Sequence, residues 1–352
     1  MTKPYREVPA DSMGELGYLN LLQDIMQHGE QKMERNGMTR KLVGSTLTMD
    51  LLNHPFPLFV SKKMFWKGIV AELDFFLNGV SDIRYLWNRN VHIWDGDWEK
   101  FARKHQTEAW VNSVMDSCNK RDNISRMKDI RYNMGNIYGV QWRGCNRFGV
   151  LGFTEDLGRP HAPDQFSKLL ESVANGGTRR DIVDAWNPSE LSDMTLPPCH
   201  ILWQVHRNGD YLDMTMYQRS ADMFLGVPFN VTSYATLLQL IAKLTGLKAR
   251  KLVMMFADAH IYEAHFDAVN EQIDRYQYVR DLYQGHGLNQ EMSPVMVFDE
   301  VPYRGGTIGE FFWDKSEDKD KYAFNLFNEK KSYMVSIQNY APLDAIKAPL
   351  LT

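Results

Sequence analysis

One cysteine in this sequence lies in a setting that suits a nucleophile. Cys199 follows Pro197 and Pro198 and precedes His200 in the string LPPCH, and the chain has only three cysteines. Most unpaired cysteines are small buried hydrophobic residues, and that interpretation stays open for Cys199. A thiol becomes a nucleophile when a nearby cation lowers its pKa and so supplies the thiolate.

The segment after the cysteine predicts such a cation. Residues 200–220, HILWQVHRNGDYLDMTMYQRS, contain two alternating runs around Asn208–Gly209, a pair typical of a two-residue β-turn. A hairpin that turns there places residue 199 opposite residue 218, to within a residue or two. We therefore expect Arg219 to lie beside the Cys199 thiol and to lower its pKa.

Other arginines at loop or strand-end positions predict a site for an anion. Arg179 and Arg180 follow two glycines, and Arg35 lies in the string ERNG. A guanidinium can bind phosphate through two parallel N–H donors, so these residues together with Arg219 could hold a phosphate group. Taken alone, Arg179 and Arg180 would equally suit a solvated pair at the start of a strand.

Further polar positions could serve a planar, hydrogen-bonding substrate. Asn230 opens a helix, where it could be a simple cap, but its amide also offers the donor and acceptor that a uracil edge needs. Glu72 lies in an apolar helix, either at its rim or as a carboxyl whose raised pKa suits proton transfer. Asp258, His260 and Tyr262 alternate along an expected strand, so they share one face and could line one pocket.

The spacing of apolar residues predicts the elements that carry these side chains. The expected helices span about 14–29, 63–79, 163–177 and 228–247, and the expected strands span about 40–51, 179–186, the two arms of the 200–220 hairpin and a short buried strand at 251–262. The stretch from 144 to 164 is expected to be a surface excursion. Long helices with hairpin-connected strands predict an α/β (α+β) protein with a large, mainly antiparallel or mixed sheet. No compositional boundary divides residues 1–352, which predicts a single domain.

The bulk composition argues against several classes of protein. A net charge of -4 and a pI near 6.2 disfavour a specific nucleic-acid partner. The polar N-terminus does not suit a signal peptide, and no apolar run is long enough to span a bilayer, so we expect a cytoplasmic protein without a membrane partner. Cys118, Cys145 and Cys199 form neither a disulfide framework nor a zinc-binding spacing, so no metal is expected.

Several long strings, in order along the chain, resemble the thymidylate synthase family. The strings are RRDIVDAWNPSELSDMTLPPCH, YQRSADMFLGVPFNVTSYATLLQLIAKLTGL and FADAHIYEAH, preceded by FPLFVSKKMFWKGIVAELDFFLNG, IWD and IYGVQWR, with a fainter match in AIKAPLLT. The likeness covers most of residues 15–270, whereas residues 271–352 diverge. It implies a thymidylate synthase fold, with a large mixed β-sheet flanked by helices, and a homodimer in which the sheets of two chains face each other.

The resemblance also implies an activity. It is the transfer of a one-carbon unit from 5,10-methylenetetrahydrofolate, the co-substrate, to C5 of dUMP, which gives dTMP. Cys199 would add to C6 of the base, and Asn230 would read the uracil edge. Glu72, His200 and Tyr138 would serve the proton-transfer and water network around the base.

The binding residues that the resemblance implies fall into three groups. Those for the phosphate are Arg35, Arg219 and Ser220 of one chain, with Arg179 and Arg180 reaching across from the partner chain. Those for the deoxyribose are His260 and Tyr262. Those for the folate are Asp222, Trp94 and Gly226, and the tail KAPLLT would close over both substrates. Because two arginines would come from the partner, the homodimer would be required for activity.

Single residues favour one member of the family over another. A cytosine-specific relative tends to carry Asp where this chain has Asn230, so the asparagine favours dUMP over dCMP. Departures from the family's pattern leave the product open: the usual Arg-Thr-Gly-Thr loop is RNGM here, and the helix that commonly reads His-Glu-Leu-Leu-Trp-Phe is AELDFF. Such drift would suit a phage-type member, acting in the cytoplasm of its host.

Two other activities are therefore alternatives to the synthase. A deoxyuridylate hydroxymethylase would let water add to the same methylene intermediate, giving 5-hydroxymethyl-dUMP and tetrahydrofolate. A catalytically silent relative that binds nucleotide or RNA is the third alternative. The retained nucleophile, arginines and Asn230 together disfavour it.

Overall fold

A computed structural model describes residues 12–119, 130–144, 164–284, 294–298 and 335–351. The expected surface excursion at 144–164 therefore lies almost entirely outside the described residues. Within them, no helix is long and apolar enough to cross a membrane.

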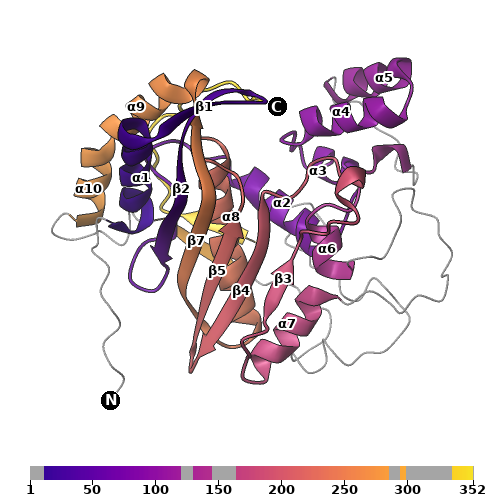
Figure 1. The fold of residues 1–352 in the computed structure, drawn as a ribbon. Coiled ribbons are helices and arrows are strands. Elements are labelled where there is room, and N and C mark those ends of the chain that lie inside the picture. The colour runs from indigo at the N-terminus through magenta and orange to yellow at the C-terminus, as the bar shows by residue number, and fades with distance from the viewer. Residues whose placement is uncertain (1–11, 120–129, 145–163, 285–293, 299–334, 352) are drawn as a thin grey trace.

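One large mixed sheet dominates the described part of the chain (Figure 1). Its strands follow the order β1-β2-β7-β5-β4-β3, and β6 pairs with β7 beyond the end of β5. Strands β5 and β6 run parallel to β7, while the other neighbours are antiparallel. The strands are β1 Glu30–Glu34, β2 Gly37–Asp50, β3 Ile182–Asp184, β4 His200–Asn208, β5 Tyr211–Gln218, β6 Ala221–Asp222 and β7 Lys248–Tyr262. The predicted fold class, an α/β protein with a large mixed sheet flanked by helices, is confirmed.

Helices pack against one face of this sheet and against its edges. The longest, α8, crosses behind β5 and β7, and α2 lies beside it (Figure 1). The helices are α1 Gly14–His28, α2 Trp66–Leu77, α3 Arg84–Trp87, α4 Asp95–His105, α5 Glu108–Asn119, α6 Gly139–Gly144, α7 Gln165–Ala174, α8 Gly226–Leu244, α9 Phe266–Asp274 and α10 Tyr276–Gln284. The two remaining described strands, β8 Val295–Phe298 and β9 Val335–Gln338, pair antiparallel with each other and form a second, two-stranded sheet.

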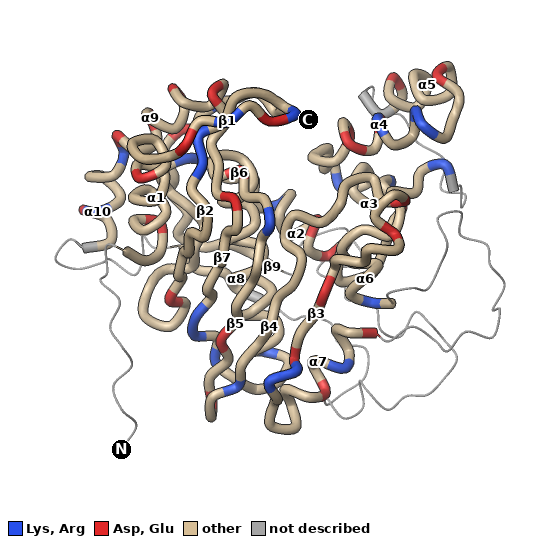
Figure 2. Tube along the Cα trace, viewed as in Figure 1, with Lys and Arg blue, Asp and Glu red and all other residues tan. Residues whose placement is uncertain are grey.

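The core forms where the inward face of the sheet meets α8 and α2. Alternate residues of a strand point to one face, so Trp203, Met214 and Met254 all point inward and are fully buried. The strands are apolar on the inward face, whereas α8 is apolar around most of its circumference, as expected for a helix enclosed by other elements. Figure 2 shows few charged residues along β4 and β5, where Arg207 and Asp213 both lie near the turn that joins them.

The opposite face of the sheet is not covered by any helix that the structure describes (Figure 1). On that face Tyr217 lies opposite Leu202 on one side and Met255 on the other. Met255 and Ile182 are each 42% exposed, which is high for large apolar side chains. A broad exposed apolar face of this kind is typical of a surface that contacts another protein.

Two sequence predictions about this sheet need correction. The hairpin turns at Gly209–Asp210 instead of Asn208–Gly209, since Asn208 pairs with Tyr211. Gly209 has φ +61°, a conformation that glycine adopts readily. Strand β7 is long, with 15 residues, because it pairs with β2 along nearly its whole length and with β5 and β6 in succession on its other side.

Candidate active site

Cys199 directly precedes β4, and Arg219, which directly follows β5, lies beside it. A β-bulge between His200 and Leu202 shifts the register, so that the Arg219 N–H donates to the Cys199 carbonyl at 2.8 Å. The Arg219 guanidinium folds back and donates to the carbonyls of Pro198 (2.8 Å) and Pro197 (2.9 Å). The later turn moves the position opposite Cys199 from residue 218 to residue 220, and the bulge moves it back to residue 219, so Arg219 lies beside the cysteine as predicted.

The electrostatics of the thiol differ from the expectation. Burial raises the pKa of the Cys199 thiol, while the Arg219 guanidinium and a hydrogen bond with Tyr138 oppose the rise without cancelling it. Arg219 does lower the pKa of the thiol, as predicted, but burial raises it by more, so the net shift is upward. Desolvation of a thiolate at this partly buried position outweighs the attraction of one cation.

Tyr138 and Gly139 place an aromatic wall beside the cysteine. The Cys199 N–H donates to the Tyr138 hydroxyl at 2.8 Å. Gly139 begins α6 so close to α2 that a Cβ there would lie 2.2 Å from the Phe76 carbonyl oxygen. Only glycine allows this approach, and the Tyr138 ring consequently stacks on Phe76 at 4.9 Å between centroids.

Glu72 carries a carboxyl suited to proton transfer. It projects from α2 and accepts a hydrogen bond of 2.7 Å from the Trp94 indole N–H. Burial raises the pKa of Glu72 to about 7, and the Trp94 hydrogen bond opposes part of that rise. The Trp94 ring also lies 6.0 Å from that of Tyr138, centroid to centroid. Of the two sequence interpretations, the structure supports the buried carboxyl with a raised pKa.

His200 is held as a neutral imidazole beside this wall. Its Nδ1 and the Tyr234 hydroxyl are 2.7 Å apart, and its ring lies 4.3 Å from that of Tyr138. Burial lowers the pKa of His200 to about 3, so the ring is uncharged at neutral pH. Tyr234 was missed from the sequence, although it lies one helical turn after Asn230 on α8.

Asn230 is positioned by a side chain that the sequence analysis did not single out. Gln218 is 2% exposed, and its amide N–H donates to the Asn230 carbonyl oxygen at 3.1 Å and to the Ser220 carbonyl at 2.9 Å. The alternative of Asn230 as a helix cap is wrong, because α8 begins earlier, after Leu225. Asp222 holds the turn that precedes that helix by accepting the N–H groups of Phe224 (3.0 Å) and Leu225 (3.1 Å).

A second polar group lies on β7 and its neighbour β2. Asp258 accepts from Lys41 at 2.8 Å and lies 2.9 Å from Nδ1 of His260. The hydrogen bond with His260, together with Lys41, holds the pKa of Asp258 down to about 2. The His260 and Tyr262 rings meet edge to face at 5.2 Å, so the alternating residues do share one face. Lys41 was not predicted, since nothing in the sequence pairs residues so far apart.

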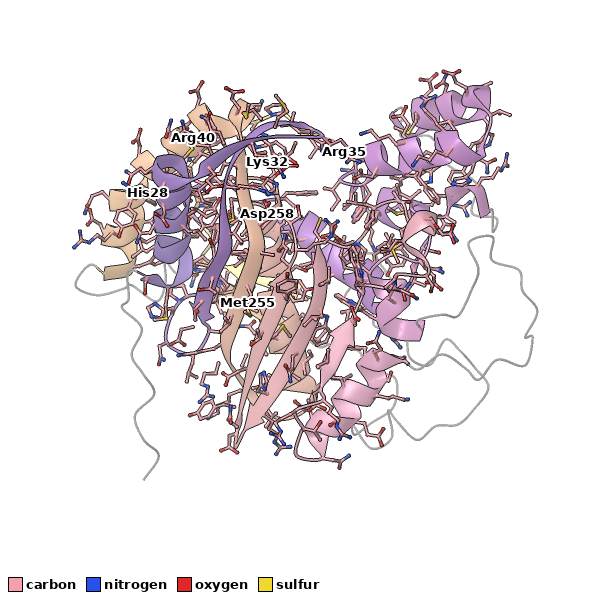
Figure 3. All side chains as sticks on the ribbon, viewed as in Figure 1. His28, Lys32, Arg35, Arg40, Met255 and Asp258 are labelled. Atoms are coloured by element: carbon pink, nitrogen blue, oxygen red, sulfur yellow. The ribbon has the colours of Figure 1, made fainter. Side chains whose placement is uncertain are left out.

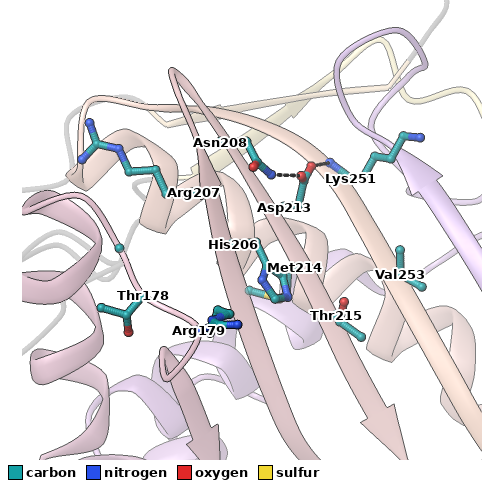
Figure 4. Close-up of a pocket in the computed structure, with 11 residues that line it drawn as sticks. Thr178, Arg179, His206, Arg207, Asn208, Asp213, Met214, Thr215, Lys251 and Val253 are labelled. Atoms are coloured by element: carbon teal, nitrogen blue, oxygen red, sulfur yellow. Dashed lines mark hydrogen bonds between the residues drawn. The ribbon is translucent and has the colours of Figure 1, made fainter. Parts of the chain in front are cut away.

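The predicted arginines separate into two places. Arg35 is exposed at the turn between β1 and β2, where Figure 3 shows it on the side that faces α4. It interacts electrostatically with Tyr262 and with Asp97 of α4. In contrast, Arg179 lines a hollow of about 710 Å³ that also involves Thr215 and Val253 of the uncovered sheet face (Figure 4).

Arg180 and Gly226 complete the set of predicted residues. Arg180 is exposed in the same loop as Arg179, and its N–H donates to the Thr178 hydroxyl at 3.0 Å. Gly226 is the first residue of α8, and a Cβ there would lie 3.6 Å from Asp222 Cβ, an ordinary contact. Packing within the chain therefore does not require glycine at 226. Among the described residues, no group of three or more His, Cys, Asp or Glu could hold a metal ion.

These observations describe a cluster of polar side chains around a cysteine, which includes a carboxyl whose pKa is raised by burial and an amide held by Gln218. The family model described as thymidylate synthase matches residues 16–284. A thymidylate synthase of Mesoplasma florum is 40% identical over 261 residues, which is 73% of this chain and 85% of the relative. Thymidylate synthase 1/2 of Encephalitozoon cuniculi is 37% identical over 261 residues, covering 73% and 81%. This chain belongs to the thymidylate synthase family, as its motifs predicted.

A longer relative shows the same similarity over part of its length. The bifunctional dihydrofolate reductase-thymidylate synthase of Leishmania major is 35% identical over 308 residues. The match covers 82% of this chain and 54% of that relative.

Proposed function

We propose that this protein transfers a one-carbon unit from 5,10-methylenetetrahydrofolate to C5 of dUMP and releases dTMP. One observation carries the proposal. Cys199 lies within a single cluster with Glu72, whose pKa is near 7, and with Asn230, whose amide is fixed. A nucleophile, an acid–base group and a reader of the base edge are the parts that this reaction needs.

Cys199 would act first, by adding its sulfur to C6 of the uracil ring. The thiol must lose its proton for this step, and the Arg219 guanidinium favours the thiolate against the effect of burial. Addition at C6 gives C5 the character of an enolate, which can then attack the methylene carbon. Loss of the C5 proton expels the folate nitrogen and leaves an exocyclic methylene group, which a hydride from tetrahydrofolate reduces to methyl. The bond from sulfur to C6 breaks in the last step, as C5 regains its double bond with C6.

Glu72 suits the proton transfers that accompany these steps. With a pKa near 7, both of its forms are well populated at neutral pH, so it can donate a proton to O4 of the base and later remove one. Neutral His200, bonded to Tyr234, can orient water without adding charge. The rings of Trp94 and Tyr138 limit access of bulk water on this side of the site.

Asn230 would select uracil. Its carbonyl oxygen can accept from N3–H of the base, and its amide N–H can donate to O4. The bond from Gln218 reaches the Asn230 carbonyl oxygen and so fixes the orientation of the amide. On the sugar side, His260 is held by Asp258 and lies beside Tyr262, which suits recognition of a 3′-hydroxyl.

The folate would supply the methylene group and a hydride. Asp222 suits its recognition, because Oδ1 accepts from the turn that precedes α8 and Oδ2 makes no hydrogen bond to the described residues, which leaves an acceptor for an N–H donor. The tail extends over this region: the Pro349 carbonyl lies 2.7 Å from Nε2 of His265, and the Leu351 carbonyl lies 3.5 Å from Nδ2 of Asn36.

We also propose that two chains pair through their uncovered sheet faces. The exposed Met255 and Ile182 would be buried in such a pair. Arg179 lies at this face in its own chain, which is consistent with a role in the partner's phosphate site (Figure 4). Arg180, in the same exposed loop, would reach across with it.

Turnover with defined substrates tests the proposal. Purified protein is mixed with dUMP and methylenetetrahydrofolate, dihydrofolate is followed by absorbance, and the nucleotide is identified by mass spectrometry. The expected products are dTMP and dihydrofolate, and Cys199→Ala should form neither. A 5-hydroxymethyl nucleotide without dihydrofolate would establish the hydroxymethylase instead, and no turnover of any pyrimidine monophosphate would refute both activities.

A further inference from the structure

A buried carboxylate on α2 takes no part in the roles above. Asp74 is fully buried, in the string AELDFF, at the position where the family commonly has leucine. It lies two residues after Glu72 on the same helix. Side chains at i and i+2 point to different sides of a helix, so Asp74 contacts a part of the chain that Glu72 does not.

The partners of Asp74 come from the residues that follow α2. The Tyr85 hydroxyl donates to Asp74 Oδ2, and Nη2 of Arg89 lies 3.6 Å from the same oxygen. The Asn78 amide donates to Oδ1 at 3.3 Å. All three groups are donors, which fits an ionised carboxylate. A buried charge is stable only while such partners stay in place, so Asp74 fixes Tyr85 and Arg89 against α2.

The stretch that begins at Tyr85 is stiffened by its own hydrogen bonds before it reaches Trp94. The Val91 N–H donates to the Leu86 carbonyl at 3.1 Å, and both of these side chains are buried. The Trp87 indole donates to the residue after Trp94, across 2.7 Å. These bonds join α3 to the start of α4, so a displacement of α3 would move Trp94 as well.

We propose that Asp74 is a positioning residue for the reaction, because it anchors α3 and so holds the Trp94 indole against the Glu72 carboxylate. The two carboxylates of α2 bond the stretch at both ends, through Tyr85 at one end and Trp94 at the other. Without the anchor at Tyr85 the bond at Trp94 is weakened, and Glu72 loses part of the interaction that favours its ionised form. The inference rests on the proposed function for the use of that proton, but its test needs no turnover.

Glu72 is the group in this cluster that titrates near neutral pH. Tyr138 before α6 and Tyr234 on α8 interact electrostatically with it, and burial raises the pKa of both tyrosines well above their usual range. Burial lowers the pKa of His200 on β4 to about 3. A signal from the Trp94 indole that changes near pH 7 therefore reports the ionisation of Glu72 among these groups.

The test observes the Trp94 indole by nuclear magnetic resonance in the isotope-labelled, full-length protein. Its Nε1–H resonance is assigned by its absence in Trp94→Phe, and its position is followed against pH. In the wild type we expect a midpoint at about pH 7. Asp74→Asn keeps the side-chain size and removes the charge. In this variant the midpoint should rise by about 0.3–0.7 pH unit, which is part of the shift that full loss of the bond would give.

A second variant and a control separate positioning from stability. Tyr85→Phe removes the hydroxyl that reaches Asp74 but keeps the ring, which lies 3.7 Å from the Arg89 guanidinium carbon, so it should raise the midpoint by a smaller amount. Asp181→Asn is the control, because Asp181 is 4% exposed and accepts from the Ser172 hydroxyl at 2.6 Å. It removes a buried carboxylate from the loop before β3, and it should leave the midpoint unchanged.

The outcomes separate this inference from the proposed function. If folded Asp74→Asn keeps the wild-type midpoint, the inference is wrong, and Tyr85→Phe decides in the same way if Asp74→Asn does not fold. An equal shift in Asp181→Asn would also overturn it. If the midpoint moves as expected but the wild type has no turnover, only the proposed function is overturned. With turnover, the descending limb of kcat/KM against pH should move with the resonance in Asp74→Asn.

Discussion

The Trp94 indole N–H donates to the Glu72 carboxylate across 2.7 Å, which joins the start of α4 to the middle of α2 beside Cys199. This bond favours the ionised carboxylate, whereas burial favours the neutral acid, and the balance leaves the pKa of Glu72 at about 7. Burial is therefore the larger cause of the pKa of Glu72, and the hydrogen bond from Trp94 moderates it.

Trp94→Phe should raise the pKa of Glu72 further. The variant removes the hydrogen bond that favours the carboxylate and leaves the burial. Because Glu72 first donates a proton to O4, its neutral form is the active one, so the descending limb of kcat/KM against pH should move up by about one unit. Glu72→Gln is the matched variant, and it should remove this limb and lower kcat by about a hundred-fold or more. A Trp94→Phe profile that coincides with the wild type would show that another group titrates.

Asn230→Asp should change the base preference of the enzyme from uracil to cytosine. A carboxylate can accept from the cytosine amino group but cannot donate to O4 of uracil, so kcat/KM for dUMP should fall by about a hundred-fold or more. Competition between dUMP and dCMP, followed by mass analysis of both products, measures the change. Because Gln218 donates to the Asn230 carbonyl oxygen, Gln218→Leu should raise the KM for dUMP while the preference for uracil over cytosine remains.

Asp258→Asn should weaken the fold in a pH-dependent way. The folded-state pKa of Asp258 is about 2, below its ordinary value of 3.8, so its ionised form stabilises the native state above pH 4. This contribution is lost as pH falls from about 4 to 2. We expect a loss of about 1–2 kcal/mol at pH 7, after allowance for solvent screening. Urea unfolding at pH 7 and pH 3 should show a smaller difference at pH 3, and Asp267→Asn, on an exposed surface, is the control.

Met255→Asp should separate the proposed pair of chains. A charge in the middle of the uncovered sheet face would be buried without a partner, so sedimentation should show a shift to monomer with loss of turnover. Lys168→Asp, at the exposed surface of α7, is the control, and it should leave the pair of chains intact. Ser45→Asp would be unsuitable, because Ser45 lies on the inward face of β2.

Mixing two inactive proteins tests whether the arginines cross between chains. Cys199→Ala lacks the nucleophile, and Arg179→Ala/Arg180→Ala lacks the cations. If the arginines serve the partner's site, one site of each mixed pair has both parts, so mixing should restore a fraction of wild-type turnover. If the arginines serve their own chain, each mixed pair has one site without the Cys199 thiol and one site without the two arginines. In that case no turnover should return.

Much of the fold follows from local patterns in the sequence. Apolar spacing predicted α1, α2, α7 and α8, and alternation predicted β2 and the β4–β5 hairpin. The length of β7 was underestimated, because it depends on pairing with β2, some two hundred residues earlier, and no local pattern contains that partner. The predicted hairpin turn was one residue off, since NG and GD are both acceptable turn pairs and the local sequence does not choose between them.

The sequence by itself determined which residues could do chemistry, and that Arg219 lies beside Cys199, because hairpin register is a local property. Only the tertiary structure decided the charge states: desolvation raises the pKa of Cys199 despite Arg219, and it raises that of Glu72 to about 7. It also decided that Lys41 is the partner of Asp258. The burial of a side chain and the charges around it depend on segments that are far apart in the sequence and meet only in the folded protein. Local sequence patterns therefore could not predict these pKa shifts.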